Sequence, residues 1–143
     1  MAKKNKAVWG TRFNNQTSKI FEKIGASIDV DKRLFEEDIF GSIVHTNMLI
    51  KQKIISKKIG KKIINGLKKI RGEIRKNKFK FNKKYEDIHL NIEKRLFEII
   101  GENGGYLHIA RSRNDQVITD FKLWIKKASK EIINNINDLL VNF

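Results

Sequence analysis

Apolar residues recur at helical spacing through the middle of the chain. Isoleucine and leucine return every three or four positions, at Ile55, Ile59, Ile63, Leu67, Ile70 and Ile74. Lysines occupy most of the positions between them, which is the pattern of an amphipathic helix with one buried face. Ser56 can cap its N-terminus, while Gly60 and Gly66 each weaken the helix interior by roughly 1 kcal/mol relative to alanine. We expect the helix to fray by Asn77.

Helices are also predicted on both sides of this segment. Upstream, Asp29 or Asp31 can cap a helix that carries apolar residues at the same period, namely Leu34, Ile39, Ile43, Val44 and Leu49. Downstream, Asp87 can cap a second helix, whose apolar residues are Ile88, Ile92, Leu96 and Ile99 or Ile100. Gly101 then supplies a glycine stop, and the segment from Glu102 to Arg113 is predicted to be irregular backbone.

The last part of the chain predicts one long helix, capped by Asn114 or Asp115 and beginning near Gln116. Two neighbouring lines of apolar residues run along it, Val117, Phe121, Trp124 and Ala128 on one and Ile118, Ile125, Ile132 and Leu139 on the other. The pattern continues for roughly 28 residues, about 40 Å, to Phe143 without a stop signal. We therefore expect a fragment that ends within an element, and a helix whose two apolar faces need neighbours.

Composition supports a helical protein. The chain has 143 residues, no proline and no cysteine, so disulfides, thiolate metal sites and thiol nucleophiles are excluded. Its basic N-terminus, Met1 to Lys6, is not followed by the apolar stretch of a signal peptide, and no window approaches the ~20 apolar residues of a membrane span. We expect an all-α protein of the cytoplasm that has no membrane partner.

The net charge of +15 comes almost entirely from one region. Lys51 to Lys84 contains fifteen lysines and arginines against one acid, a balance of +14. Such a segment can bind nucleic-acid phosphates, with Phe79 and Phe81 stacking on bases. The abundance of lysine, isoleucine and asparagine throughout the chain favours a solvated surface instead, and nucleic acid is the less favoured partner.

Two features are candidates for chemistry. His45, His89 and His108 lack partners at metal-ligand spacing, so metal binding is not expected; His89 can pair with Glu86 or Glu93, or can bond to a helix cap. The densest polar cluster is Arg111, Ser112, Arg113, Asn114, Asp115 and Gln116, at the start of the long helix. Free N–H groups, the positive helix end and two guanidinium groups suit a carboxylate or phosphate. The alternative is a helix cap with solvated arginines.

Four segments carry a family resemblance. They are VWGTRF (Val8 to Phe13), GASIDVDKRLFEEDIFGSIVH (Gly25 to His45), YEDIHLNIEKRL (Tyr85 to Leu96) and GGYLHIARSRNDQVITDFKLW (Gly104 to Trp124). In order and spacing they resemble the N-terminal part of the argininosuccinate lyases, members of the fumarase/aspartase superfamily. The resemblance implies a helical N-terminal domain over residues 1–113 and the first helix of a central helical bundle over residues 114–143. It also implies a homotetramer whose active sites draw residues from three subunits.

The resemblance implies a reaction as well. Argininosuccinate is cleaved to arginine and fumarate by β-elimination in arginine biosynthesis, with no metal or organic cofactor. Ser27, Ser112, Arg113 and Asn114 match substrate-binding positions, and His89, Arg111 and Asp115 match supporting ones. The threonine–histidine pair that supplies the base and the serine loop that supplies the acid lie beyond Phe143. No catalytic acid or base is therefore expected here, and the isolated segment should be inactive and should self-associate.

The sequence departs from the family pattern at two places. Ile109 and Ala110 stand where the family usually has Thr-Gly, and Thr11 replaces the second glycine of WGGRF. The family helix matching Lys57 to Lys76 is also commonly acidic. Two alternatives stay open: a non-catalytic or differently specific homologue, such as a crystallin-like protein, and a small basic helical protein that binds nucleic acid.

Overall fold

The computed structural model describes residue 20 and residues 24–142. The segment VWGTRF, and with it the Thr11 departure, lies outside the described residues. Over the described part of the chain all regular structure is helical and no strand occurs, so the predicted all-α class is confirmed. None of the described helices is both long enough and apolar enough to cross a membrane.

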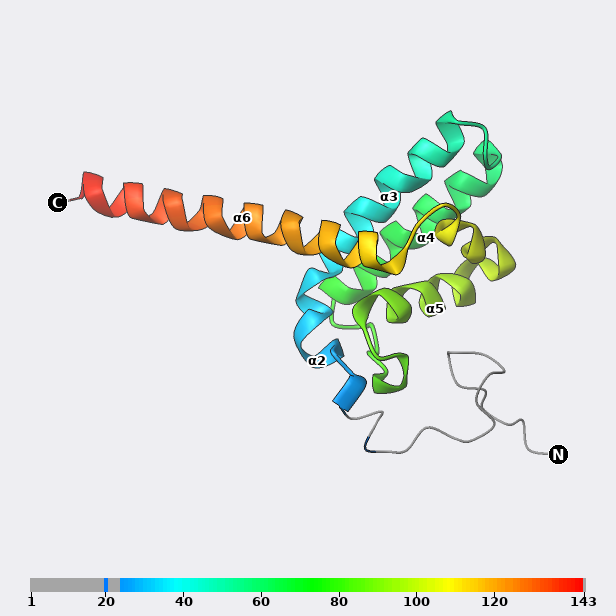
Figure 1. Cartoon of the computed structure of the whole chain (residues 1–143), viewed down its shortest axis with the longest axis horizontal. Helices are drawn as coiled ribbons and strands as arrows, with labels where there is room; N and C mark the ends of the chain where they lie inside the picture. Colours follow the sequence, from blue (N-terminus) through cyan, green and yellow to red (C-terminus); the bar gives the residue numbers. More distant parts are fainter. Residues whose placement is uncertain (1–19, 21–23, 143) are drawn as a thin grey trace.

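Three helices form the body of the molecule. They are α3 (Phe35–Lys51), α4 (Lys57–Arg75) and α5 (Ile88–Ile100), and Figure 1 shows them side by side. Most residues of the predicted apolar periods face one another in a single core, whose fully buried members include Ile39, Leu49, Ile63, Leu67, Ile70, Ile88, Ile92 and Leu96. Val44 was predicted on this face but is 52% exposed. Residues far apart in sequence meet there because each helix can bury only one stripe and the other helices cover it.

Two glycines of α4 allow close packing rather than merely weakening the helix. A Cβ built on Gly60 would lie 2.3 Å from Cδ1 of Ile50, and one built on Gly66 would lie 2.5 Å from Cδ1 of Leu96. Leu96 is fully buried, so it has little room to move away. The sequence-based expectation of a simple propensity cost therefore missed what these glycines do in the core.

Gly66→Ala should lower the free energy of unfolding by about 1–3 kcal/mol, although alanine is the better helix former, because the added methyl overfills the contact with Leu96. Gly72→Ala on the same helix is the matched control: a Cβ at Gly72 would have no atom within 4 Å, so this change should stabilise by up to about 1 kcal/mol. Urea unfolding followed by circular dichroism measures both. Equal stabilisation by the two alanines would contradict the packing argument.

Two of the four predicted helix caps are confirmed. Ser56 caps α4 by accepting from the Ile59 N–H at 3.3 Å, and Asp87 caps α5 by accepting from the Leu90 N–H at 2.6 Å, both as predicted. The other two predictions were wrong. Neither Asp29 nor Asp31 caps the upstream helix, which is split into α2 (Ile28–Asp31), a short 3-10 turn (Lys32–Leu34) and α3.

The long helix α6 (Arg113–Val141) starts three residues earlier than predicted. Ser112 is its cap and accepts from the Asn114 N–H at 3.2 Å, so neither Asn114 nor Asp115 performs that role. Gly101 ends α5 with a φ of 64°, as expected of a glycine stop. The segment after it is more regular than predicted, because Gly101–His108 forms the 3-10 helix η4.

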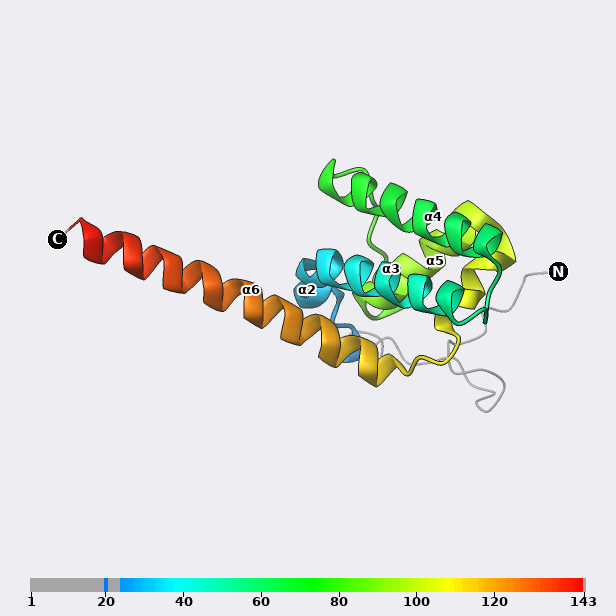
Figure 2. The same ribbon diagram turned by 90° about the horizontal axis from the view of Figure 1, so that it is seen from above.

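The first turns of α6 pack on the body, against α3 and the 3-10 turn Lys32–Leu34 that precedes it. Beyond them the helix extends away as an isolated rod, which Figures 1 and 2 show from two directions. Its apolar residues remain in solvent; Ile132, Ile136, Leu139 and Leu140 are each more than half exposed. The rod therefore has the uncovered apolar surface that the two sequence stripes predicted.

Candidate functional site

Three of the predicted site residues, Ser27, His89 and Arg113, lie around the N-terminal end of α5. The Ser27 and Ile28 N–H groups both donate to the Glu86 carbonyl oxygen at 2.9 Å, which fixes the Ser27 turn beside the start of that helix. Glu86 has a φ of 56° and a ψ of −61°, a rare conformation for a residue with a side chain. Backbone held in this way is common at binding sites, where surrounding contacts outweigh the strain.

Ser27 and Asp31 form one side of the site. The Ser27 hydroxyl donates to Asp31 Oδ2 at 2.6 Å, and Asp31 Oδ1 accepts from the Ile88 N–H at 3.2 Å. Burial raises the pKa of Asp31, and the nearby charge of Asp87 adds to the increase. Asp31 was predicted only as a helix cap, so this role was missed, although its spacing of four from Ser27 places both side chains on one helix face.

Arg113 forms the other side. Its guanidinium donates to Glu93 at 3.0 Å and to Gln116 Oε1 at 2.7 Å, and its Nε lies 3.9 Å from Asp87 Oδ2. Asn114 is the next residue and is exposed. Its backbone N–H donates to Ser112 Oγ, and its side chain makes no hydrogen bond within the described residues. The Ser27 turn and the start of α6 thus both contact the first residues of α5.

Arg111 and Arg113 are not the solvated arginines of the alternative interpretation. The Arg111 side chain is only 9% exposed, and it donates to Ser42 Oγ at 2.9 Å and lies 3.8 Å from Asp38. Arg111 is therefore held inside, while Arg113 stays at the rim. Asp115 is exposed in the first turn of α6, where a negative charge favours the helix.

His89 has different partners from those expected. It does not pair with Glu86 or Glu93; it is buried, with Nδ1 lying 3.2 Å from Asp38 and 3.5 Å from Asp120. Gly41 makes room for this cluster, because a Cβ there would lie 3.3 Å from Asp120 Oδ1. Asp38 and Asp120 are distant in sequence from His89, so no local pattern could reveal the contact.

The ligand atoms of Asp38, His89 and Asp120 lie within 4.8 Å of one another, close enough to hold a metal ion. Positive charge is already supplied by the protein, however. Asp38 Oδ1 accepts from the Gln116 amide and faces the guanidinium of Arg111. A cluster with its own cations favours a shared proton over a divalent ion.

Protonation of the cluster depends strongly on its burial. Burial and the charge of Asp38 raise the pKa of Asp120 to about 8. Burial alone would lower the pKa of His89, but contact with Asp38 outweighs it and the pKa is raised. Burial alone would likewise raise the pKa of Asp38, yet the contact with His89 lowers it. The folded protein therefore holds protons here that the unfolded chain would release.

The free energy of unfolding should fall as the pH rises from about 5 to about 8, because over this range the folded state binds more protons than the unfolded state. Each additional bound proton contributes a slope of ~1.4 kcal/mol per pH unit. Asp120→Asn removes one of these protons and should make the decline shallower. Unfolding free energies of both proteins across this range measure the difference. Parallel profiles would contradict the raised pKa of Asp120.

Ala110 carries backbone strain at the edge of the site. Its φ is 54°, a region that alanine rarely adopts and glycine adopts freely. The sequence departure at this position therefore concerns conformation rather than chain flexibility. His45 holds the adjoining residue, because its Nε2 lies 2.9 Å from the Ile109 carbonyl oxygen.

Ala110→Gly should raise the free energy of unfolding by about 0.5–1 kcal/mol, because relief of the positive φ exceeds the entropy that glycine adds to the unfolded chain. Ala128→Gly in the interior of α6 should instead destabilise by about 1 kcal/mol. Thermal melts of the two variants should therefore shift in opposite directions. A loss of stability from both would show that Ala110 is unstrained.

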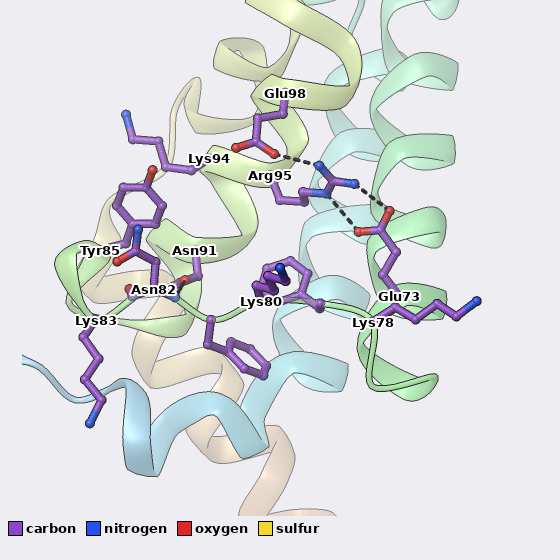
Figure 3. Close-up of a pocket in the computed structure, with 12 residues that line it drawn as sticks. Glu73, Lys78, Lys80, Asn82, Lys83, Tyr85, Asn91, Lys94, Arg95 and Glu98 are labelled. Carbon is purple, nitrogen blue, oxygen red and sulfur yellow. Dashed lines mark hydrogen bonds and ion pairs between the residues drawn. The ribbon is translucent and has the colours of Figure 1, made fainter.

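The lysine-rich segment lines a groove of about 570 Å³ between the loop after α4 and the exposed side of α5 (Figure 3). Its central cation is already paired: Arg95 donates to both Glu73 oxygens at 2.9 Å and to Glu98 at 2.7 Å. Phe79 and Phe81 contact each other, with ring centroids 4.9 Å apart. Arg95 and the two phenylalanines are thus engaged in contacts within the protein.

A sequence model of the family described as "Lyase" matches residues 11–143. The chain belongs to this lyase family. Among the curated proteins similar to it are several argininosuccinate lyases. The protein of Pelagibacter ubique is 63% identical over 138 residues, which cover 96% of this chain and 30% of the relative. That of Ehrlichia canis is 49% identical over 94% of the chain and 29% of the relative, and that of Bartonella bacilliformis is 50% identical over 93% and 28%.

The chain thus spans about 30% of the length of the lyases it matches, and it resembles their N-terminal part. The resemblance drawn from the four motifs is confirmed by this family membership. The lyase match covers the described helices as well as most of the residues that precede them.

Proposed function

We propose that this chain is the N-terminal part of an argininosuccinate lyase, which cleaves argininosuccinate to arginine and fumarate in the cytoplasm during arginine biosynthesis. The observation that carries the proposal is the meeting of the Ser27 turn and the start of α6 at the first residues of α5. Relatives named for this activity, which align over more than nine-tenths of the chain, support it.

The site carries both signs of charge, as a substrate with carboxylates and a guanidinium group requires. Arg113, Asn114 and the N–H groups at the start of α6 can hold a carboxylate. Asp31 and Asp87 can face the cationic part of the substrate. Ser112 contributes indirectly: its side chain caps α6 and so holds the first turn of this helix in place.

Within residues 1–143 we assign binding and orientation, not proton transfer. In the elimination a base removes a proton from the carbon next to a carboxylate, and an acid protonates the departing nitrogen. The dianionic intermediate needs hydrogen-bonding groups placed in advance, and Asn114 supplies one of these. Arg113 holds a carboxylate that is charged in the substrate and in the intermediate alike. The base and acid are assigned to other parts of the enzyme.

We also propose that residues 1–113 form the N-terminal domain and residues 114–143 the first helix of a central bundle in a homotetramer. The apolar residues on the far half of α6 support this arrangement. They are exposed to solvent in this chain, and packing in a helical bundle would bury them. Ile125, Ile132 and Leu139 share one line along the rod and would pack against sister helices.

The test is a hybrid enzyme, in which residues 1–143 replace the matching part of the Pelagibacter ubique argininosuccinate lyase. The purified hybrid enzyme should form fumarate from argininosuccinate, and the ultraviolet absorbance of fumarate measures its formation. Other fumarate-releasing substrates, such as adenylosuccinate, should give no product. A hybrid enzyme that assembles as a tetramer and does not cleave argininosuccinate would refute the proposal and favour a non-catalytic homologue.

A further inference from the structure

Three helices each direct a pair of polar side chains, one turn apart, into the junction behind the site. The pairs are Asp38 and Ser42 on α3, His89 and Glu93 on α5, and Gln116 and Asp120 on α6. Figure 2 shows the start of α6 lying along α3 at this junction. Gln116 is the member that contacts both the buried cluster and the rim.

Gln116 is 2% exposed and uses both ends of its amide. Its Nε2 donates to Asp38 Oδ1, and its Oε1 accepts from Arg113 Nη1 at 2.7 Å. An ionised carboxylate only accepts hydrogen bonds and a guanidinium only donates them, so the group between them must do one of each. This sets the orientation of the amide.

Arg113 is held at a second point. Its Nη2 donates to Glu93 Oε2 at 3.0 Å, while Glu93 Oε1 lies 3.5 Å from His108 Nδ1. Two contacts on different terminal nitrogens fix the plane of the guanidinium, and three of its five N–H groups remain for other acceptors. Loss of either contact would let the plane rotate.

We propose that Gln116 is a positioning residue, which holds the Arg113 guanidinium in the plane that receives a substrate carboxylate by bridging it to the buried carboxylate of Asp38. The inference rests on the proposed function, since it assigns Arg113 to carboxylate binding. Gln116 does not touch the substrate itself.

Gln116→Met in the hybrid enzyme keeps the volume and removes both hydrogen bonds. Because a misaligned Arg113 weakens ground-state and transition-state binding alike, KM should rise about tenfold and kcat should change less than about threefold. The inhibition constant of fumarate should rise in parallel with KM. A purely structural role would instead lower the amount of folded enzyme and reduce kcat at unchanged KM.

Gln116→Glu provides a second test that does not depend on the first. Ionised, the introduced carboxyl can only accept, so it repels Asp38 and KM should be raised; protonated, it can donate to Asp38 and accept from Arg113 as glutamine does. The ratio of its KM to that of the unmodified hybrid enzyme should therefore fall toward one as the pH is lowered. The charged and titratable groups at the junction are Asp38, His89, Glu93, His108, Arg111, Arg113 and Asp120. The unmodified hybrid enzyme carries all of them and is therefore the reference at every pH.

Thr46→Val is the control, because it removes a buried hydrogen bond elsewhere in the protein. The Thr46 hydroxyl is fully buried and donates to the Ser42 carbonyl oxygen at 2.7 Å, without contact to Arg113. This variant should lose stability and keep its KM. An unmodified hybrid enzyme without activity would overturn the proposed function, whereas an active one whose KM is unaffected by both changes at Gln116 would overturn only the positioning role.

Discussion

Asn114→Ala should lower kcat/KM of the hybrid enzyme by about 100-fold while leaving its melting temperature unchanged. The side chain is exposed and, among the described residues, makes no hydrogen bond, so its removal costs the fold almost nothing. A donor aimed at developing negative charge is worth a few kcal/mol in the transition state, which corresponds to this loss in rate.

Asn65→Ala is the matched control, since Asn65 is also an exposed asparagine on a helix but lies in the middle of α4. It should leave kcat/KM within about twofold and stabilise slightly, because alanine is the better helix former. Steady-state kinetics and thermal melts of both variants check the pair. Full activity of Asn114→Ala would remove Asn114 from the site.

Asp38→Asn should destabilise the chain by about 3–5 kcal/mol near neutral pH, the largest loss of stability that we expect from an isosteric change. Asp38 receives the Gln116 amide and faces both His89 and Arg111, so its neutralisation leaves buried cations without their counter-charge. The pKa of Asp38 is lowered in the folded state, so its contribution is present above its ordinary value and is lost as the pH falls through the folded pKa.

The difference between Asp38→Asn and the unmodified chain should therefore close in strong acid. Asp138→Asn serves as the control, because Asp138 is exposed on the rod of α6 and should cost less than about 0.5 kcal/mol. Urea titrations at several pH values measure these differences. A loss for Asp38→Asn no larger than that of the control would show that the cluster is not held by charge.

The helices could be predicted because their signals are local. Period, cap and glycine stop lie within a few residues of one another in α4 and α5, where Ser56, Asp87 and Gly101 act as expected. The start of α6 was misplaced because Ser112, Asn114 and Asp115 are all good caps, and it is the Ser112 side chain that accepts from the helix. Gly66 acquires its meaning only from Leu96, thirty positions away.

The site was predictable only in part. Helix-start chemistry around Arg113 and Asn114 left two interpretations open, an anion site and a helix cap with solvated arginines. The family resemblance favoured the anion site and added Ser27. Asp38 and Asp120 carried no sequence signal, since their meeting with His89 depends on how three helices cross. The burial of Arg111 was hidden for the same reason.

The decisive measurement is a crystal structure of the hybrid enzyme with bound fumarate. We expect one fumarate carboxylate within hydrogen-bonding distance, about 3 Å, of the Asn114 side chain and the Arg113 guanidinium, with Ser27 at the same pocket. Fumarate bound at full occupancy in an assembled active site, with Asn114 and Arg113 facing away from it, would show that the start of α6 is not the carboxylate site.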